Sequence, residues 1–185
     1  MSRLRAISPA ATALAALTLA AGPALAANGV SVSQESTGLA FDIDFDQATI
    51  TFSYNENGGR SNNVPSYEIV AVAGQAPVPL LSLGPCQVNQ AGDGLECPAA
   101  QILSLDFRFR QSGFWSGYNG GGNHASPCAP AGVTVETGPG KVVEINTWDG
   151  CPETVICSTA RGSLIIVEAD ASDEVRGPCS SIQRH

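Results

Sequence analysis

Residues 39–46 alternate apolar and acidic side chains so strictly that they constrain the fold more than any other part of the chain. The apolar side chains are Leu39, Phe41, Ile43 and Phe45, and the acidic ones are Asp42, Asp44 and Asp46. A period of two places each set on its own side of an extended backbone, as in a half-buried β-strand. The chain is therefore expected to build a sheet with one apolar and one solvated face.

Later segments repeat this pattern, and none after residue 26 keeps the helical period of about 3.6 residues. Strands are predicted at residues 50–54, 67–72, 103–110, 133–135, 142–145, 154–157 and 164–167. In residues 103–110, the side chains expected to face the core together are Leu103, Leu105, Phe107 and Phe109. Pro77 and Pro79 confine their segment to a sheet edge or a loop, because proline cannot donate a ladder hydrogen bond. We predict an all-β fold.

The strands are short and recur at short intervals, which leaves two architectures open. One is a short-stranded sandwich, and the other is a β-roll or β-helix-like coil with short strands in every turn. The periodicity alone does not separate the two. Residues 27–185 suit one domain, or two subdomains at 27–112 and 113–185.

The first 26 residues have the features of a cleaved signal peptide. Arg3 and Arg5 precede an apolar run at residues 10–22, and Ala-Leu-Ala at residues 24–26 supplies a cleavage site. The alternative is a membrane anchor, but an apolar run of about 13 residues is too short for a bilayer core of roughly 30 Å. We expect a bacterial protein that is secreted, or periplasmic in a cell with an outer membrane, with no membrane span after cleavage.

The charge of the chain argues against two classes of partner. The net charge is −8 over 185 residues, and removal of Arg3 and Arg5 makes the remainder more acidic. Nucleic acids and anionic membranes are bound by clustered cations, so neither is expected here. The acidity favours solubility, cation binding or a basic partner.

The cysteines predict covalent cross-links. All six lie after residue 26, at Cys86, Cys97, Cys128, Cys151, Cys157 and Cys179. An even count in an exported chain predicts three disulfides, but six cysteines allow 15 connectivities and their spacing does not choose among them. The chain has no C-x-x-C motif and only two histidines, so a zinc site is not expected.

Two segments combine cysteines with a strand and a turn that contains aspartate. The first combines Gly-Pro-Cys-Gln-Val-Asn at 84–89 with Gly-Asp-Gly-Leu-Glu-Cys-Pro-Ala-Ala at 92–100 and the strand at 103–109. The second combines Glu-Thr-Val-Ile-Cys at 153–157 with Asp-Ala-Ser-Asp-Glu-Val at 170–175, followed by Cys179 and Ile182. Both segments resemble units of secreted bacterial hemolysin-type (RTX-like) calcium-binding repeat proteins. The resemblance implies local pairing of Cys86 with Cys97 and of Cys157 with Cys179, which leaves Cys128 with Cys151.

The chain departs from that family at the metal-binding turns. A calcium-binding G-G-x-G-x-D turn needs glycines to free its carbonyl groups and an aspartate to supply charge. The nearest versions, residues 120–124 and 138–141, both lack the aspartate, and the second has Lys141. The resemblance therefore implies a degenerate relative whose metal function has eroded, with calcium as the cofactor to test.

Two acidic groups are candidate metal ligands. Asp42, Asp44 and Asp46 have the spacing that opens an EF-hand loop, but Gln47 replaces its glycine and Ser53 its bidentate glutamate. We favour the solvated face of a strand, with a weak cation site as the alternative. The second group comprises Glu168, Asp170, Asp173 and Glu174. A charged loop that caps the last strand is favoured there over a calcium site.

The Gly-rich segment at residues 113–122 is a candidate binding loop. It carries Phe114, Trp115 and Tyr118, whose rings could stack on a sugar or anchor a protein partner. The alternative is that the rings fold back over the end of the sheet.

Catalytic candidates are poor. A Ser-His-Asp arrangement needs an oriented histidine. His124 lies in the Gly-rich segment, where Asp106 and several serines could approach it, but nothing in the sequence shows that they do, and His185 is terminal. We therefore favour a secreted non-catalytic binding or structural module, as a degenerate calcium-binding repeat protein. The alternative is carbohydrate or protein recognition through residues 114–118, and a small hydrolase that uses His124 ranks third.

Overall fold

A computed structural model gives the fold. It describes residues 28–45, 47–56, 64–74, 76–111, 116–119, 128–138, 142–158 and 164–185. The expected signal peptide at residues 1–26 lies outside these ranges, as do Asp46, Phe114, Trp115 and His124.

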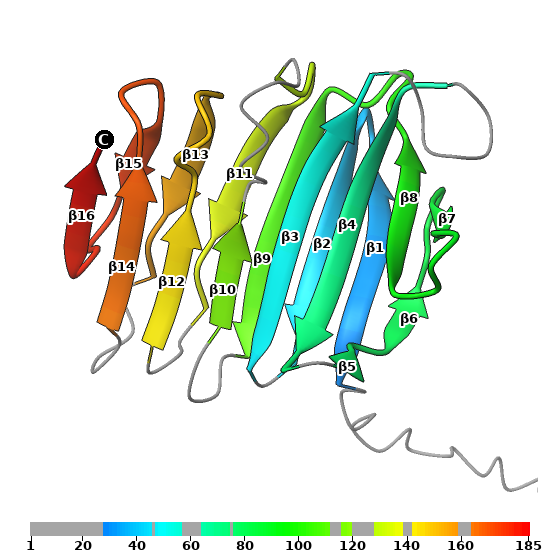
Figure 1. Cartoon of the computed structure of the whole chain (residues 1–185), viewed down its shortest axis with the longest axis horizontal. Coiled ribbons are helices and arrows are strands. Elements are labelled where there is room, and N and C mark those ends of the chain that lie inside the picture. The colour runs from blue at the N-terminus through cyan, green and yellow to red at the C-terminus, as the bar shows by residue number, and fades with distance from the viewer. Residues whose placement is uncertain are drawn as a thin grey trace, which may run out of the picture.

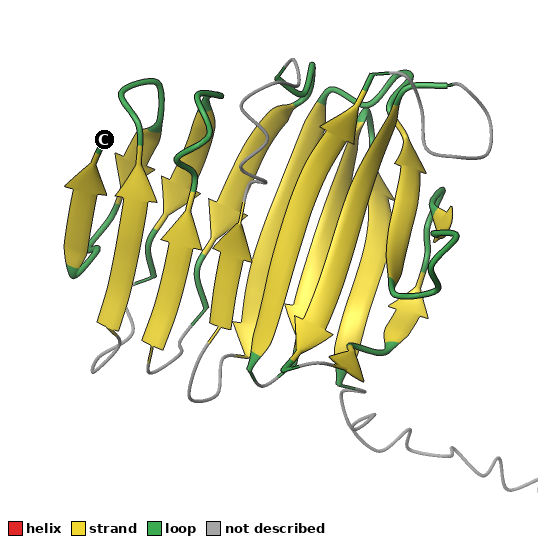
Figure 2. Cartoon of the chain, in the orientation of Figure 1, coloured by secondary structure: helices red, strands yellow, loops and turns green. Residues whose placement is uncertain are grey.

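The described part of the chain consists of strands, turns and loops and contains no helix, which confirms the predicted all-β fold (Figure 2). The strands are β1 (Gly29–Glu35), β2 (Gly38–Asp44), β3 (Ala48–Asn55), β4 (Ser66–Ala73), β5 (Ala76–Pro77), β6 (Leu80–Ser82), β7 (Gln87–Val88), β8 (Gly94–Pro98), β9 (Ser104–Gln111), β10 (Ser116–Asn119), β11 (Gly132–Glu136), β12 (Val142–Asn146), β13 (Glu153–Ile156), β14 (Leu164–Ala169), β15 (Glu174–Arg176) and β16 (Ser181–Arg184). They form two sheets that face each other (Figure 1).

The chain winds between the two sheets as a β-roll. Sheet A has the order β15-β13-β11-β9-β2-β1-β6, and sheet B has the order β16-β14-β12-β10-β3-β4-β8-β7, with β5 beside β4. The chain passes from A to B in each of the pairs β2–β3, β9–β10, β11–β12, β13–β14 and β15–β16, and successive pairs stack in parallel. Of the two architectures that the sequence left open, the chain therefore adopts the coiled one.

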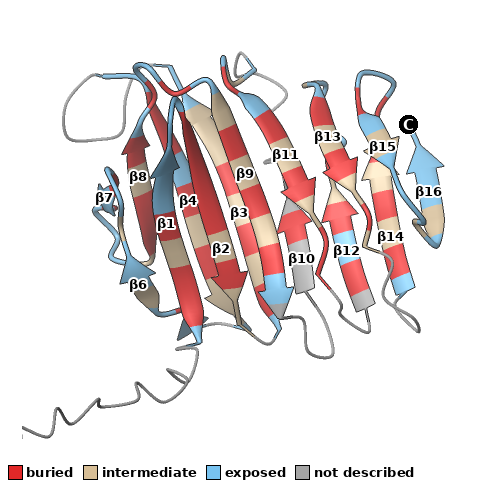
Figure 3. Ribbon diagram, turned by 180° about the vertical axis from the view of Figure 1, so that it is seen from behind, coloured by how far each residue is buried: buried red, intermediate tan, exposed pale blue. Residues whose placement is uncertain are grey.

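Inward-facing side chains of successive coils form ladders that build the core. In sheet A, Phe41 lies beside Phe107, and the ladder continues through Val135, Val155 and Val175. The alternation of buried and less buried residues along these strands follows from the two-residue period (Figure 3). Phe107 also contacts Tyr118 of sheet B, with ring centroids 5.3 Å apart, so aromatic rings join the two sheets.

The first coil is extended by strands that leave the coiled path. Strand β1 pairs antiparallel with β2, and between β3 and β9 the chain forms β4 to β8. Within this insertion, β4 pairs antiparallel with β3 and with β8, and β8 pairs with β7. The insertion widens sheet B at the end of the roll remote from β16.

Three disulfides cross-link the domain, in the pairs that the resemblance implies. Cys86 bonds to Cys97 within the insertion, Cys128 to Cys151, and Cys157 to Cys179. The last two join successive coils, across sequence separations of 23 and 22 residues. Closing a loop of that size contributes roughly 3 kcal/mol in the chain-entropy description, which compensates for short strands.

Two expectations about individual segments are wrong. Strand β10 (Ser116–Asn119) lies inside the segment that was predicted to be a Gly-rich loop. Leu103 was predicted to face the core with Leu105, but 65% of its surface is exposed because β9 begins only at Ser104. Pro77 lies in the short edge strand β5, as its missing N–H group requires.

Candidate functional site

A groove of about 530 Å³ crosses the outer face of sheet B on the insertion. Its polar lining includes Glu68 of β4, Glu96 of β8, Gln87 of β7 and, from the turn between β7 and β8, Asn89, Gln90 and Asp93. A concave surface with a few convergent polar groups is the usual form of a ligand site. We take this groove as the candidate functional site.

Asn89 holds two of the carboxylates on the groove wall. Its amide Nδ2 donates to Glu68 Oε1 at 3.1 Å and to Asp93 Oδ1 at 2.8 Å. Its Oδ1 accepts the backbone N–H groups of Asp93 and Gly94, each at 3.1 Å. Because only 8% of Asn89 is exposed and both ends of its amide are occupied, the carboxylates are fixed before any ligand arrives.

Glu68 and Glu96 face each other across adjacent strands of the groove floor. They are register partners in the antiparallel pair of β4 and β8, and Gln87 of β7 is the next partner of Glu96. Like charges directly opposite in a sheet are destabilising, by up to about 1 kcal/mol. Within the described part of the chain no ion pair relieves this repulsion, as the distribution of ion pairs shows.

The four ion pairs among the described residues all lie on sheet A. They are Arg108 with Glu35, Arg108 with Asp106, Arg110 with Asp42, and Arg176 with Glu174. The Arg108 guanidinium lowers the pKa of the Glu35 carboxyl through a hydrogen bond and its charge. None of these pairs includes a carboxylate of the groove, so the groove presents its negative charge to a ligand.

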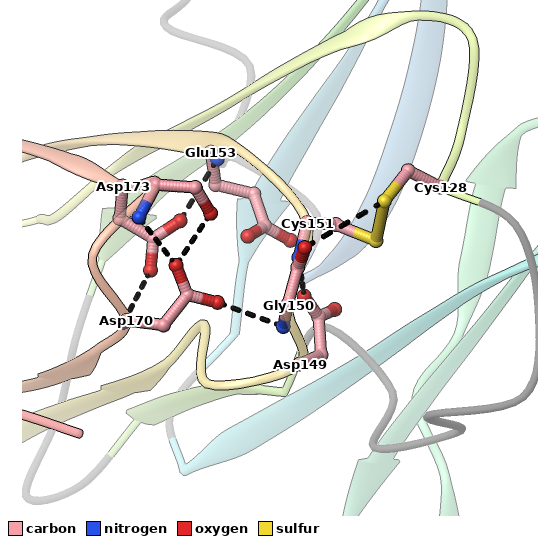
Figure 4. Close-up of a disulfide and its surroundings, with 8 residues drawn as sticks. Cys128, Asp149, Gly150, Cys151, Glu153, Asp170 and Asp173 are labelled. Atoms are coloured by element: carbon pink, nitrogen blue, oxygen red, sulfur yellow. Dashed lines mark hydrogen bonds between the residues drawn. A yellow bond between two sulfur atoms is a disulfide. The ribbon is translucent and has the colours of Figure 1, made fainter.

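A second acidic region lies at the corner where β12 turns into β13 (Figure 4). Asp173 accepts the backbone N–H groups of Glu153 at 3.0 Å and Asp170 at 2.9 Å, and the Thr147 hydroxyl at 2.7 Å. Asp170 accepts the N–H groups of Gly150 and Ser172, each at 2.7 Å. These aspartates therefore fix the loops of successive coils.

Hydrogen bonding at this corner also changes proton affinity. Burial raises the pKa of the Asp170 carboxyl, but hydrogen bonds from Ser172 and from the Gly150 backbone outweigh it, so the pKa lies below its usual value. Asp170 is consequently a carboxylate that is already satisfied by the protein.

Glu153 has the opposite behaviour at the same corner. Only 3% of its surface is exposed, and its Oε2 has no hydrogen-bond partner within the described ranges. Burial, together with the charges of Asp149 and Asp173, raises its pKa from 4.5 to about 10. Glu153 is therefore a neutral acid at neutral pH, and it lies at the edge of the core.

Of the residues proposed from the sequence, Asp170 and Asp173 lie together at this corner, whereas the others that the structure describes do not form a site. Asp42 pairs with Arg110, and Asp44 is partly buried on the same strand. Tyr118 is 2% exposed and belongs to the core, where burial raises the pKa of its hydroxyl well above the usual value. Its ring is therefore not available at the surface. No three acidic, cysteine or histidine side chains in the described segments are arranged to hold a metal ion.

The groove and one aromatic surface were missed by the sequence reasoning. Trp148 is 47% exposed and stacks on the imidazole of His185, with ring centroids 4.2 Å apart. The alternation in residues 67–72 marks Glu68 as outward-facing, but nothing in the sequence pairs it with Glu96.

Comparison of the chain with protein-family models, with curated proteins and with solved structures found no match. The described segments also contain no helix that is long and apolar enough to cross a membrane.

Proposed function

We propose that this protein is an exported, non-catalytic binding module whose ligand occupies the groove on the outer face of sheet B. The observation that carries the proposal is Asn89, a buried amide whose two donors are both spent on holding Glu68 and Asp93 at the groove wall. Groups fixed in advance reduce the entropy cost of binding. Insertions between coils of a repeat structure commonly form its binding face.

Export and ancestry belong to the same proposal. Three disulfides in a small β domain suit an oxidising compartment, and residues 1–26 have the composition of a signal peptide. The proposal includes descent from calcium-binding repeat proteins of the RTX-like class, for which a coil of parallel strands is the expected architecture. We propose the groove, and not the segment 114–118, as the recognition surface, because Tyr118 is buried.

The test uses a matched pair of variants. Asn89→Asp keeps the acceptor for the two backbone N–H groups but replaces the donors to Glu68 and Asp93 with a repelling oxygen. Asn146→Asp is the control, because Asn146 also donates to a glutamate (Glu168 Oε2, 3.1 Å) and accepts a backbone N–H (Trp148, 3.1 Å), but away from the groove.

Thermal midpoints of the three proteins are compared with a neutral disaccharide, with glucuronate and with an aliphatic amine. We expect at least one compound to raise the midpoint of the wild type and of Asn146→Asp, but not of Asn89→Asp. If no compound does so, or if Asn89→Asp responds like the control, the groove is not a ligand site.

A further inference from the structure

The groove continues into a second hollow that is aliphatic. This hollow, of about 250 Å³, is lined by Val64, Pro65, Pro85 and Pro98, and it shares Ser66, Gln87 and Glu96 with the groove. Val64 is 48% exposed. A ligand that reaches the carboxylates thus lies beside a wall of proline rings.

The negative charge of the groove favours a positively charged ligand. Glu68, Asp93 and Glu96 line it together with amides and small apolar side chains, and none of the described lining residues is a lysine or arginine. Neither Glu68 nor Glu96 has an ion-pair partner in the described segments, although the two lie directly opposite each other. A cation between them removes their repulsion, and the net charge of −8 attracts cations from a distance.

The separation of the carboxylates does not suit the binding of a single metal ion. No three acidic groups of the described residues converge on one point, whereas calcium requires six to eight oxygen ligands around it. Ammonium groups on a methylene chain match separated carboxylates, because each donates charge-assisted hydrogen bonds while its methylene groups cover apolar surface.

We infer that the groove binds an aliphatic polyamine, with ammonium groups on Glu68, Asp93 and Glu96 and the methylene chain against Val64 and the three prolines. This inference rests on the proposed function and specifies its ligand. Asn89 supports it by fixing one oxygen of Glu68 and one of Asp93, which leaves the other oxygen of each free for an ammonium group.

Calorimetric titration with matched ligands tests the inference. Spermidine and cadaverine are the polyamines, and pentanediol has the cadaverine spacer with hydroxyl groups in place of ammonium groups. We expect spermidine to bind more tightly than cadaverine, pentanediol not to bind, and both polyamine affinities to fall as ionic strength rises.

The protein variants isolate the carboxylates. The double variant Glu68→Gln/Glu96→Gln keeps the acceptor for Asn89 and removes the like-charge pair, so its thermal midpoint is expected to equal or exceed that of the wild type. Its spermidine affinity is expected to fall by at least about tenfold, the effect of losing one hydrogen bond to a charged group. Glu144→Gln is the control, since Glu144 lies on the same sheet with β10 and β3 between β12 and β4.

The outcomes separate the two proposals. If the disaccharide or glucuronate binds in an Asn89-dependent way and spermidine does not, the polyamine inference is wrong and the binding module stands. The inference also fails if calcium competes fully with spermidine at equal ionic strength, if only a lysine-rich peptide binds, or if the double variant and Glu144→Gln bind spermidine equally. If no ligand binds, both proposals fail.

Discussion

At the scale of single residues, Glu153 is the residue that departs most from its neighbours in the ladder. Its register partner in the preceding coil is Val133, and the partner of Val133 is Leu105. The same inward position is thus apolar in two coils and acidic in the next. A buried carboxyl without a cation stays neutral, because the charged form is desolvated and repelled.

This position predicts a pH-dependent stability. The pKa of Glu153 is raised from 4.5 to about 10 on folding. Its contribution to the free energy of unfolding is therefore fully present below pH 4.5 and is lost as pH rises toward 10. The slope approaches about 1.4 kcal/mol per pH unit within that window, as an upper bound. Glu153→Gln, which cannot ionise, is expected to raise the free energy of unfolding at pH 8 by ~2 kcal/mol.

Urea unfolding across a pH series measures this effect. The exposed Glu144→Gln provides the control for loss of one carboxyl. If the free energies of unfolding of the wild type and of Glu153→Gln change in parallel with pH, Glu153 is ionised in the folded protein and the argument is wrong.

At the scale of elements, alternation predicted the strands that have one strongly apolar face. Burial in β9 alternates from Ser104 to Phe109, whereas in β2 it alternates only from Phe41 onward because Ala40 is buried as well. Strand β10 was missed because Ser-Gly-Tyr-Asn has little strand propensity of its own, and parallel pairing with β3 and β12 supplies the missing stability. Pairing of this kind joins residues that are distant in sequence, so a local pattern does not show it.

The candidate site could not be predicted from the sequence for the same reason. Glu68 and Glu96 meet only through the register of β4 and β8, and Asn89 reaches Glu68 only because a turn returns the chain to β8. The acidic residues chosen from the sequence, such as Asp170 and Asp173, turned out to accept loop N–H groups. Their spacing is equally suited to capping loops and to binding calcium.

The spacing between coils makes a prediction about glycine. Gly177 has φ +86°, and a Cβ there would lie 2.6 Å from the carbonyl oxygen of Cys157 in the preceding coil. Gly150 has φ +83°, but nothing lies within 4 Å of its Cβ position. Gly150→Ala is expected to lose ~1 kcal/mol from backbone conformation alone, and Gly177→Ala at least ~2 kcal/mol because the coils must also separate.

Denaturant unfolding measures these losses. A shift of the midpoint without a change in the slope of unfolding free energy against denaturant concentration reports a difference in stability. Equal destabilisation by the two substitutions would mean that the coils yield at Cys157 without cost, and the argument from close approach would then be wrong.

At the scale of the whole molecule, the roll divides into a coiled part and an insertion with different roles. The coils from β9 to β16 contact only their neighbours, as in other repeat structures, and two disulfides secure them. The insertion between β3 and β9 carries the groove and its own disulfide. The binding that we propose for the groove would not depend on the turns that hold metal in calcium-binding repeat proteins.

Calcium is therefore expected to act on this protein only as a screening cation. The carboxylate oxygens of Asp170 and Asp173 already accept N–H groups of the loops, so a calcium ion would have to displace those bonds. At equal ionic strength, calcium and magnesium should raise the thermal midpoint equally, by reducing repulsion within a chain of net charge −8, and a chelator should leave the midpoint of the purified protein unchanged. A rise specific to calcium that disappears in Asp173→Asn would instead reveal a functioning calcium site between the last two coils.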